Sequence, residues 1–220
     1  MMRNHRKLPR LKRSRHSREP QRKFILFCEG AKTEVAYFKA IRRVYSSTLI
    51  DLEVHGGAGV PYTIAEKAIE QAKSLGLIRR SRRRKDSYET GDRVWAVFDR
   101  DDHPRFNEAV ANCQACNVGV GFSNPCFELW LILHERDVGR YEDRHAMQST
   151  LARLRPEYDP DGAKTPDCDD LVKRVEAAEQ RSETQLQRRM EEDNPYGNPS
   201  TTVGRLTREI REANTRAARP

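Results

Sequence analysis

Three acidic residues follow two short apolar segments and could together bind a metal ion. Glu29 follows the apolar residues 24–28, and Asp99 and Asp101 follow residues 94–98. Short apolar runs that stop abruptly are typical of strands buried on both faces of a parallel sheet. If the two strands are parallel neighbours, the three carboxylates meet at the carboxyl edge of the sheet, where open α/β sheets bind ligands. Carboxylates held together need a cation or raise one another's pKa, so we expect a divalent-metal site.

The chemistry of such a site would be phosphoryl transfer assisted by Mg²⁺ or Mn²⁺. Hard cations prefer carboxylate oxygens, water and substrate phosphate as ligands. Asp99 and Asp101 are two residues apart at a strand end, so their side chains project the same way. Glu29 would bind a second ion or act as a base, and two ions about 4 Å apart stabilise both the attacking and the leaving oxygen. Aspartate is also common in turns after strands, which is the structural alternative.

The elements that would position these residues alternate between strands and helices, which predicts an α/β fold. We expect a parallel four-stranded sheet with helices on both faces, followed by a C-terminal helical extension. The expected strands are residues 24–28, 50–55, 94–98 and 118–122, and the clearest helices are 33–44, 62–75, 127–133, 167–190 and 202–214. The predicted divisions are a disordered arm (1–22), an α/β domain (23–145) and the helical extension packing on that domain (146–220).

The net charge of +8 is concentrated at the N-terminus. Residues 1–23 hold ten Lys and Arg residues and one acidic residue, whereas the rest of the chain holds 31 basic and 32 acidic residues. Basic arms commonly reach for nucleic acid, although a tail that only aids solubility is the alternative. A second basic run, residues 79–85, is either a polyanion contact or a solvated loop.

Composition excludes several other classes of protein. No apolar run approaches the roughly 18 residues of a membrane span. The apolar run after the basic N-terminus is too short for a signal peptide, so we expect a cytoplasmic protein without membrane contact. Five cysteines form an odd, scattered set, so we expect reduced thiols. Cys113 and Cys116 form a lone C-x-x-C pair without the second pair that a structural zinc site needs.

Three ordered motifs carry a family resemblance. They are Glu29-Gly30 followed by Thr33-Glu34 and Tyr37-Phe38, then Val97-Phe98-Asp99-x-Asp101, then Phe122-Ser123-Asn124-Pro125-Cys126-Phe127-Glu128-Leu129-Trp130. The first two resemble the Toprim domain of topoisomerases, primases and OLD-type nucleases. Together the motifs resemble the RloB-like family, which is associated with bacterial restriction-modification and phage-defence loci. Residues 198–203 also resemble that family, so the resemblance spans about 23–206.

The resemblance implies a Toprim/Rossmann-like fold and Mg²⁺-dependent cleavage or transfer at phosphodiester bonds. Glu29 would then be an acid/base or metal ligand, with Asp99 and Asp101 as metal ligands. OLD-type enzymes also use a lysine near the scissile phosphate, for which Lys164 is the first candidate and Lys32 the second. Such nucleases often work with an ATPase, which would be a separate subunit because this chain lacks a P-loop motif. The sequence leaves open whether the protein is a homodimer.

Several other residues have both a functional and a structural interpretation. Ser123 and Asn124 would bind substrate phosphate at a helix start, or would only cap that helix. Glu128, one turn into the helix, is interpreted as a further contact to metal or substrate, with compensation of the helix dipole as the alternative. Thr33 and Glu34 begin a helix and would orient Glu29. His103 and His134 are interpreted as structural.

The leading hypothesis is therefore a metal-dependent nuclease acting on DNA or RNA in phage defence. The first alternative is a non-catalytic subunit of a defence system that binds nucleic acid or a protein partner, for which the basic arm is the supporting feature. A small-molecule phosphotransferase or nucleotide-binding enzyme is a weaker alternative. The glycine-rich residues 56–59 are not followed by the Lys-Ser/Thr of a phosphate loop.

Overall fold

The computed structural model describes residues 22–45, 50–78, 92–100, 103–160 and 165–217. The predicted arm up to residue 21, the basic run 79–85, Asp101 and Lys164 lie outside these residues. The roles expected for them stay predictions.

A five-stranded sheet forms the centre of the fold, with strand order β2-β1-β3-β4-β5. The strands are β1 (Arg22–Cys28), β2 (Ile50–His55), β3 (Arg93–Asp99), β4 (Gly119–Asn124) and β5 (Ser200–Thr201). The first four are parallel, and β5 pairs antiparallel with β4. The predicted α/β class is confirmed. The sequence did not predict β5, because a strand of two residues has no periodicity to detect.

Alternate residues of β1 and β3 enter two separate hydrophobic cores. Phe24, Leu26 and Val97 belong to one core, and Ile25 and Phe98 belong to the other. This alternation follows from the strand period of two, and it requires helices on both faces of the sheet.

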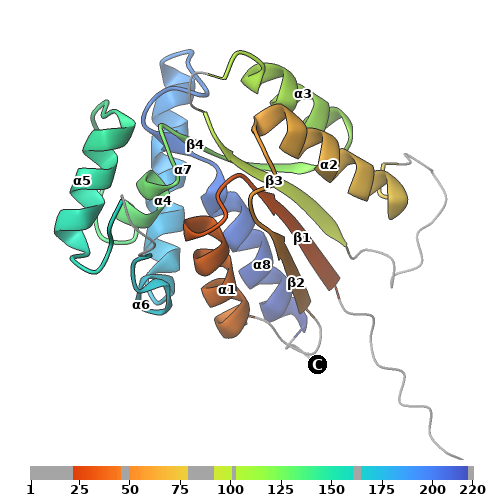
Figure 1. Ribbon diagram of the computed structural model, residues 1–220, viewed down its shortest axis with the longest axis horizontal. Helices are drawn as coiled ribbons and strands as arrows, with labels where there is room; N and C mark the ends of the chain where they lie inside the picture. Colours follow the sequence, from red (N-terminus) through yellow and green to blue (C-terminus); the bar gives the residue numbers. More distant parts are fainter. Residues whose placement is uncertain (1–21, 46–49, 79–91, 101–102, 161–164, 218–220) are drawn as a thin grey trace, which may run out of the picture.

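Helices cover both faces, as the sequence predicts. Figure 1 shows α1 (Thr33–Tyr45) and α8 (Val203–Ala217) on one side of the sheet and α2 (Pro61–Ser74) and α3 (Phe106–Ala115) on the other. Residues of α1 and α8 enter the first core and residues of α2 and α3 enter the second. Pro61 begins α2, a position where its missing N–H costs nothing.

Four further helices extend the first core. They are α4 (Glu128–Ile132), α5 (Arg144–Leu154), α6 (Cys168–Val172) and α7 (Val175–Glu191). Every residue of α4 is buried, so this short helix is a central part of the core. The sequence predicts one helix over 167–190, because the apolar pattern continues across the break between α6 and α7. No helix within the described ranges is long and apolar enough to cross a membrane.

Candidate functional site

Glu29 and Asp99 lie side by side at the carboxyl edge of the sheet. Their strands β1 and β3 are parallel neighbours, and the backbone N–H of Glu29 continues the pairing by donating to the carbonyl of Val97 at 3.0 Å. One carboxylate oxygen of Glu29, Oε2, accepts a hydrogen bond from the backbone N–H of Asp99 at 3.0 Å. The structure therefore brings together the two described members of the predicted carboxylate set.

Glu34, in the first turn of α1, turns back toward the end of β1. Its Oε1 accepts a hydrogen bond from the backbone N–H of Gly30 at 3.0 Å, and the side chain is buried. A Cβ atom on residue 30 would lie 1.8 Å from Oε2 of Glu34. The glycine after Glu29 therefore leaves the space into which Glu34 packs.

Glu128 reaches the same edge from the first position of α4. The apolar residues that follow it are fully buried, and their burial fixes α4 and places Glu128 at its N-terminal end. Glu128 is 9% exposed, and its Oε1 accepts a hydrogen bond from the Tyr158 hydroxyl at 2.7 Å. A carboxylate at a helix N-terminus is also favoured by the helix dipole.

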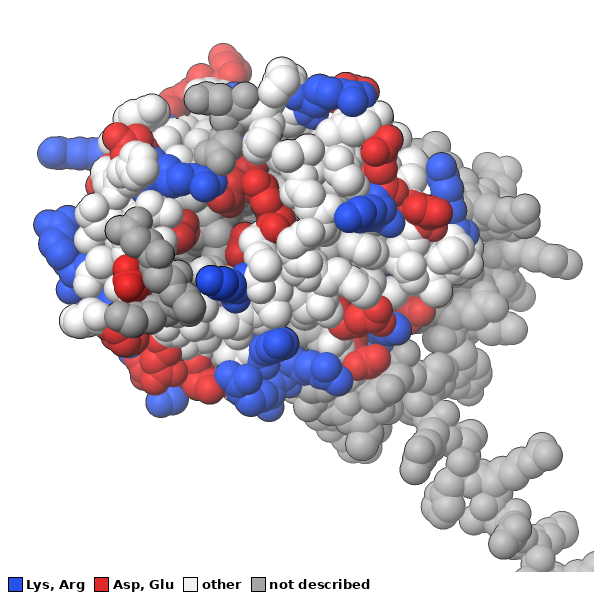
Figure 2. Space-filling view, in the orientation of Figure 1, with Lys and Arg blue, Asp and Glu red and all other residues white. Residues whose placement is uncertain are grey.

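Glu29, Glu34, Asp99 and Glu128 interact electrostatically, and we call them the carboxylate group. Burial raises the pKa of Asp99 well above its usual range, and the charges of Glu34, Glu128 and Glu29 raise it further. Burial also raises the pKa of Glu34, with smaller contributions from Glu128 and Glu29 and with opposing backbone hydrogen bonds. Figure 2 shows acidic side chains gathered near the middle of the face presented, with basic side chains around them. Such a concentration of like charge favours a bound cation.

Arg144 is a site residue that the sequence did not indicate. It is the first residue of α5, and its guanidinium donates to Oδ2 of Asp99 at 2.8 Å, which opposes the rise in the pKa of that carboxyl. Asp143 caps α5 by accepting from the N–H of Ala146 at 2.8 Å, which fixes the start of the helix beside the site. No sequence signal identifies Arg144, because it lies in a polar stretch and meets Asp99 only through the fold.

His103, interpreted as structural from the sequence, also lies near the carboxylate group. Its Nε2 is 3.8 Å from Oε1 of Glu29, and its side chain is 32% exposed. An imidazole at this distance could exchange a proton with the carboxylate through a small movement or one water molecule.

The remaining residues of the predicted site are not members of the carboxylate group. Ser123 pairs with Asp99 in the β3–β4 register, but it is 1% exposed and its hydroxyl is hydrogen-bonded to that of Thr201 at 3.0 Å. The side-chain amide of Asn124 donates to the carbonyl of Tyr196 at 2.7 Å. Lys32 is exposed, and Thr33 is the first residue of α1. Ser123 therefore uses its hydroxyl inside the protein, and the phosphate contact expected of it stays a prediction.

The donor chemistry of the carboxylate group fits Mg²⁺ or Mn²⁺, because all its side-chain donors are carboxylate oxygens. Within the part of the chain that the structure describes, no three His, Cys, Asp or Glu side chains are arranged so that they could hold a metal ion. Glu29 and Asp99 are the two predicted ligands that the structure describes, and both lie at this edge.

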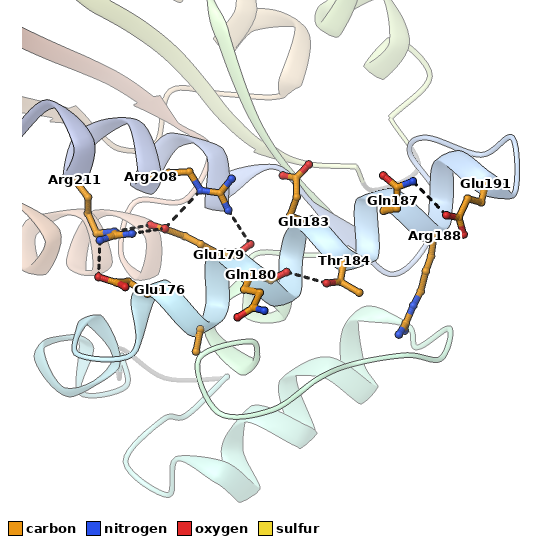
Figure 3. A pocket seen from close by; sticks show the side chains of 11 residues that line it. Glu176, Glu179, Gln180, Glu183, Thr184, Gln187, Arg188, Glu191, Arg208 and Arg211 are labelled. Carbon is orange, nitrogen blue, oxygen red and sulfur yellow. Dashed lines mark hydrogen bonds and ion pairs between the residues drawn. The ribbon is translucent and has the colours of Figure 1, made fainter.

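A cavity that is separate from the carboxylate group lies between α7 and α8. It has a volume of about 860 Å³ and is lined by residues of α7 and α8 (Figure 3). Arg211 there forms ion pairs with Glu179 at 2.9 Å and with Glu176 at 2.6 Å. Glu179 is almost fully buried, so this pairing chiefly holds the two helices together. The lining includes no member of the carboxylate group.

Comparison with known proteins identifies one family. The family model described as RloB-like protein matches residues 24–210, which include the sheet and the carboxylate group. Searches of the curated proteins and of the solved structures found no match. The match covers most of the chain, including all five strands except the first residues of β1.

Proposed function

Because the chain belongs to the RloB-like protein family, we propose that it is a metal-dependent nuclease of the Toprim type that acts in bacterial phage defence. The proposed reaction is hydrolysis of phosphodiester bonds in DNA or RNA. The observation that carries the proposal is the hydrogen-bonded pair of Glu29 and Asp99 at the carboxyl ends of two parallel strands, with Glu34 and Glu128 beside it. Open α/β sheets bind their ligands at this edge.

Electrostatics supports the requirement for a cation. Arg144 donates to Asp99, but Glu29, Glu34 and Glu128 also act on that carboxyl, so these described residues give the site a negative potential. A phosphodiester is itself anionic and would be repelled from this potential. A divalent cation held by Glu29, Asp99 and Asp101 would offset part of this negative charge and activate a water molecule for attack on phosphorus.

The protein's own residues would orient and position the reactants. The N–H of Asp99 fixes the rotamer of Glu29, and Arg144 fixes that of Asp99. Glu34 closes the loop after β1 through Gly30 and thereby orients Glu29. Glu29 is also the proposed acid/base, and Lys164, or else Lys32, would approach the scissile phosphate.

A cleavage assay tests the proposal. Purified protein is incubated with single-stranded DNA, duplex DNA and structured RNA in Mg²⁺, Mn²⁺ or EDTA, with a separate ATPase subunit added where one is identified. We expect metal-dependent cleavage that Glu29→Gln and Asp99→Asn abolish, while the exposed variant Glu70→Gln keeps full activity. Cleavage by both site variants at the wild-type rate would refute the assignment of the site.

The alternative is a non-catalytic subunit, and the Arg144–Asp99 ion pair favours it because it gives Asp99 a structural role. In that case metal has no effect, and binding of nucleic acid depends on the basic arm. Deleting residues 1–21 would then abolish binding and its steep salt dependence. Under the nuclease proposal, the same deletion lowers affinity but leaves metal-dependent cleavage at high enzyme concentration.

A further inference from the structure

A second cavity adjoins the carboxylate group on the side of β4. Its volume is about 560 Å³, which lies within the range of about 300–1,000 Å³ common for ligand pockets. Arg144 connects the two sites, because it lines the cavity and also donates to Asp99. Arg100, another lining residue, directly follows Asp99 in the chain. A molecule in this cavity would therefore lie beside the proposed reaction centre.

The charges of the cavity wall differ from those of the carboxylate group. Among the described residues that line it, Arg100, Arg144 and His145 are basic and Asp143 is acidic. The carboxylate of Asp143 accepts the capping hydrogen bond of α5, which offsets part of its charge. The wall is therefore suited to an anion such as a phosphodiester.

The wall is held in place by contacts that do not involve a ligand. Arg100 donates to the carbonyl of Tyr196 and packs its guanidinium over the ring of Phe106, 5.6 Å from the ring centre. The side-chain amide of Asn198 donates to the carbonyl of Glu142 at 2.8 Å. These contacts tie the loop after α7 to the end of β3 and to the connection before α5, so the cavity is largely formed before any ligand binds.

Tyr141 supplies an aromatic surface at this cavity. It lies in the connection between α4 and α5, and it is 75% exposed although most large hydrophobic side chains among the described residues are buried. A tyrosine ring exposed beside cationic groups is suited to stack on a nucleobase, as in proteins that bind single strands. The bases of a duplex are stacked and paired, so they could not reach this ring without unpairing.

We propose that this cavity binds an unpaired nucleotide of a nucleic-acid strand, with Tyr141 stacking on its base and Arg100, Arg144 and His145 facing its phosphates. The inference rests on the proposed function and narrows its substrate to single-stranded nucleic acid, or to an unpaired stretch within a duplex. The strand passes from this cavity to the carboxylate group, where the next phosphodiester is cut.

Binding experiments on the full-length chain test the inference. Fluorescence anisotropy is measured with a labelled single strand of about 12 nucleotides, as DNA and as RNA, and with the matching duplex. The protein carries Glu29→Gln and the buffer contains Mg²⁺, so that the strand stays intact, which a gel verifies. We expect the single strand to bind at least about tenfold more tightly than the duplex. UMP and TMP are tested as competitors and should compete far more weakly than the unlabelled strand.

Variants of Tyr141 give the specific readout. Tyr141→Ala should weaken single-strand binding about tenfold, whereas Tyr141→Phe keeps the aromatic ring and should bind like the parent protein. Met190→Ala, an exposed apolar residue on α7, is the matched control and should leave affinity unchanged. The effect of Tyr141→Ala should persist at high salt, where the contribution of the basic arm is weak.

Three results would overturn the inference. They are tighter binding of the duplex, unchanged affinity in Tyr141→Ala, and competition by mononucleotides as strong as that by the strand. Each of these leaves the nuclease proposal intact if Glu29-dependent cleavage is observed. If the wild-type protein does not cleave nucleic acid but binds single strands in a way that depends on Tyr141, the nuclease proposal is refuted. The proposed binding site is then supported independently.

Discussion

The carboxylate of Glu29 accepts a hydrogen bond from the backbone N–H of Asp99, at 3.0 Å, and so joins the ends of β1 and β3. The two residues are 70 positions apart in the chain. This contact gives Glu29 a structural role in addition to its proposed chemical one, and the two roles can be separated by the choice of substitution.

Glu29→Gln and Glu29→Ala should have different effects on stability. Glutamine keeps an oxygen that can accept from the Asp99 N–H, so its free energy of unfolding should stay within about 0.5 kcal/mol of the wild type. Alanine leaves the N–H without this acceptor and should cost about 1–2 kcal/mol. Urea denaturation measures the difference, while both variants should lack cleavage. Equal stability of the two variants would mean that the hydrogen bond does not hold the strand ends together.

Arg144→Met should destabilise the protein in a way that a divalent cation reverses. Removing the guanidinium leaves Asp99 buried among like charges, which should cost about 1–3 kcal/mol given that Arg144 is partly exposed. Mn²⁺ should raise the melting temperature of this variant more than that of the wild type, because the cation replaces the lost positive charge. Arg153→Met on the same helix is the control and should show no such difference. An equal response to Mn²⁺ in all three proteins would argue against a cation beside Asp99.

Gly30→Ala should disturb the site more than the fold. The added Cβ would lie 1.8 Å from Oε2 of Glu34, so Glu34 must leave its position and lose its bond to the residue 30 N–H. We expect a loss of about 1–2 kcal/mol in stability and at least a tenfold loss of cleavage rate. Gly139→Ala is the control, since the nearest atom to its added Cβ is 4.0 Å away. Wild-type cleavage in Gly30→Ala would show that Glu34 does not orient Glu29.

His134 should make stability depend on pH. Its Nδ1 donates to the carbonyl of Trp130 at 2.9 Å, so its Nε2 accepts from the Tyr37 hydroxyl at 3.0 Å and the ring is neutral. Burial lowers the pKa of His134 from 6.5 to about 3. Between these values the unfolded chain binds a proton that the folded protein does not. Stability is therefore complete above pH 6.5 and falls as the pH drops toward 3, by up to about 1.4 kcal/mol per pH unit.

Chemical denaturation between pH 5 and pH 8 measures this dependence. His134→Gln should be less stable at pH 8, because the buried network with Tyr37 is broken, and it should lose less stability on acidification. His55→Gln, which changes an exposed histidine, should follow the wild-type pH dependence. If the stability of His134→Gln depends on pH as that of the wild type does, then groups other than His134 cause the loss of stability in acid.

The four parallel strands and the carboxylates at the ends of β1 and β3 can be predicted from the sequence alone. Buried parallel strands are continuous apolar runs, so the ends of β1 and β3 are visible as the positions where Glu29 and Asp99 interrupt those runs. Local patterns also placed β2 and the start of α1, since strand and helix periods are properties of neighbouring residues. The sequence analysis assumes that β1 and β3 are neighbours, and the observed strand order β2-β1-β3-β4-β5 confirms that assumption.

Packing between elements that are distant in sequence sets which other side chains join Glu29 and Asp99. Arg144 pairs with Asp99 because α5 packs beside the strand ends. The hydroxyl of Ser123 is hydrogen-bonded to that of Thr201 because β5 joins the sheet. These partners lie 45 and 78 positions away in the chain, so no local sequence pattern around Asp99 or Ser123 indicates them. The cavity beside Arg144 likewise combines residues from four separate stretches of the chain. Helices and strands follow from the preferences and spacing of neighbouring residues. Ion pairs and side-chain hydrogen bonds depend on how elements that are distant in sequence pack together.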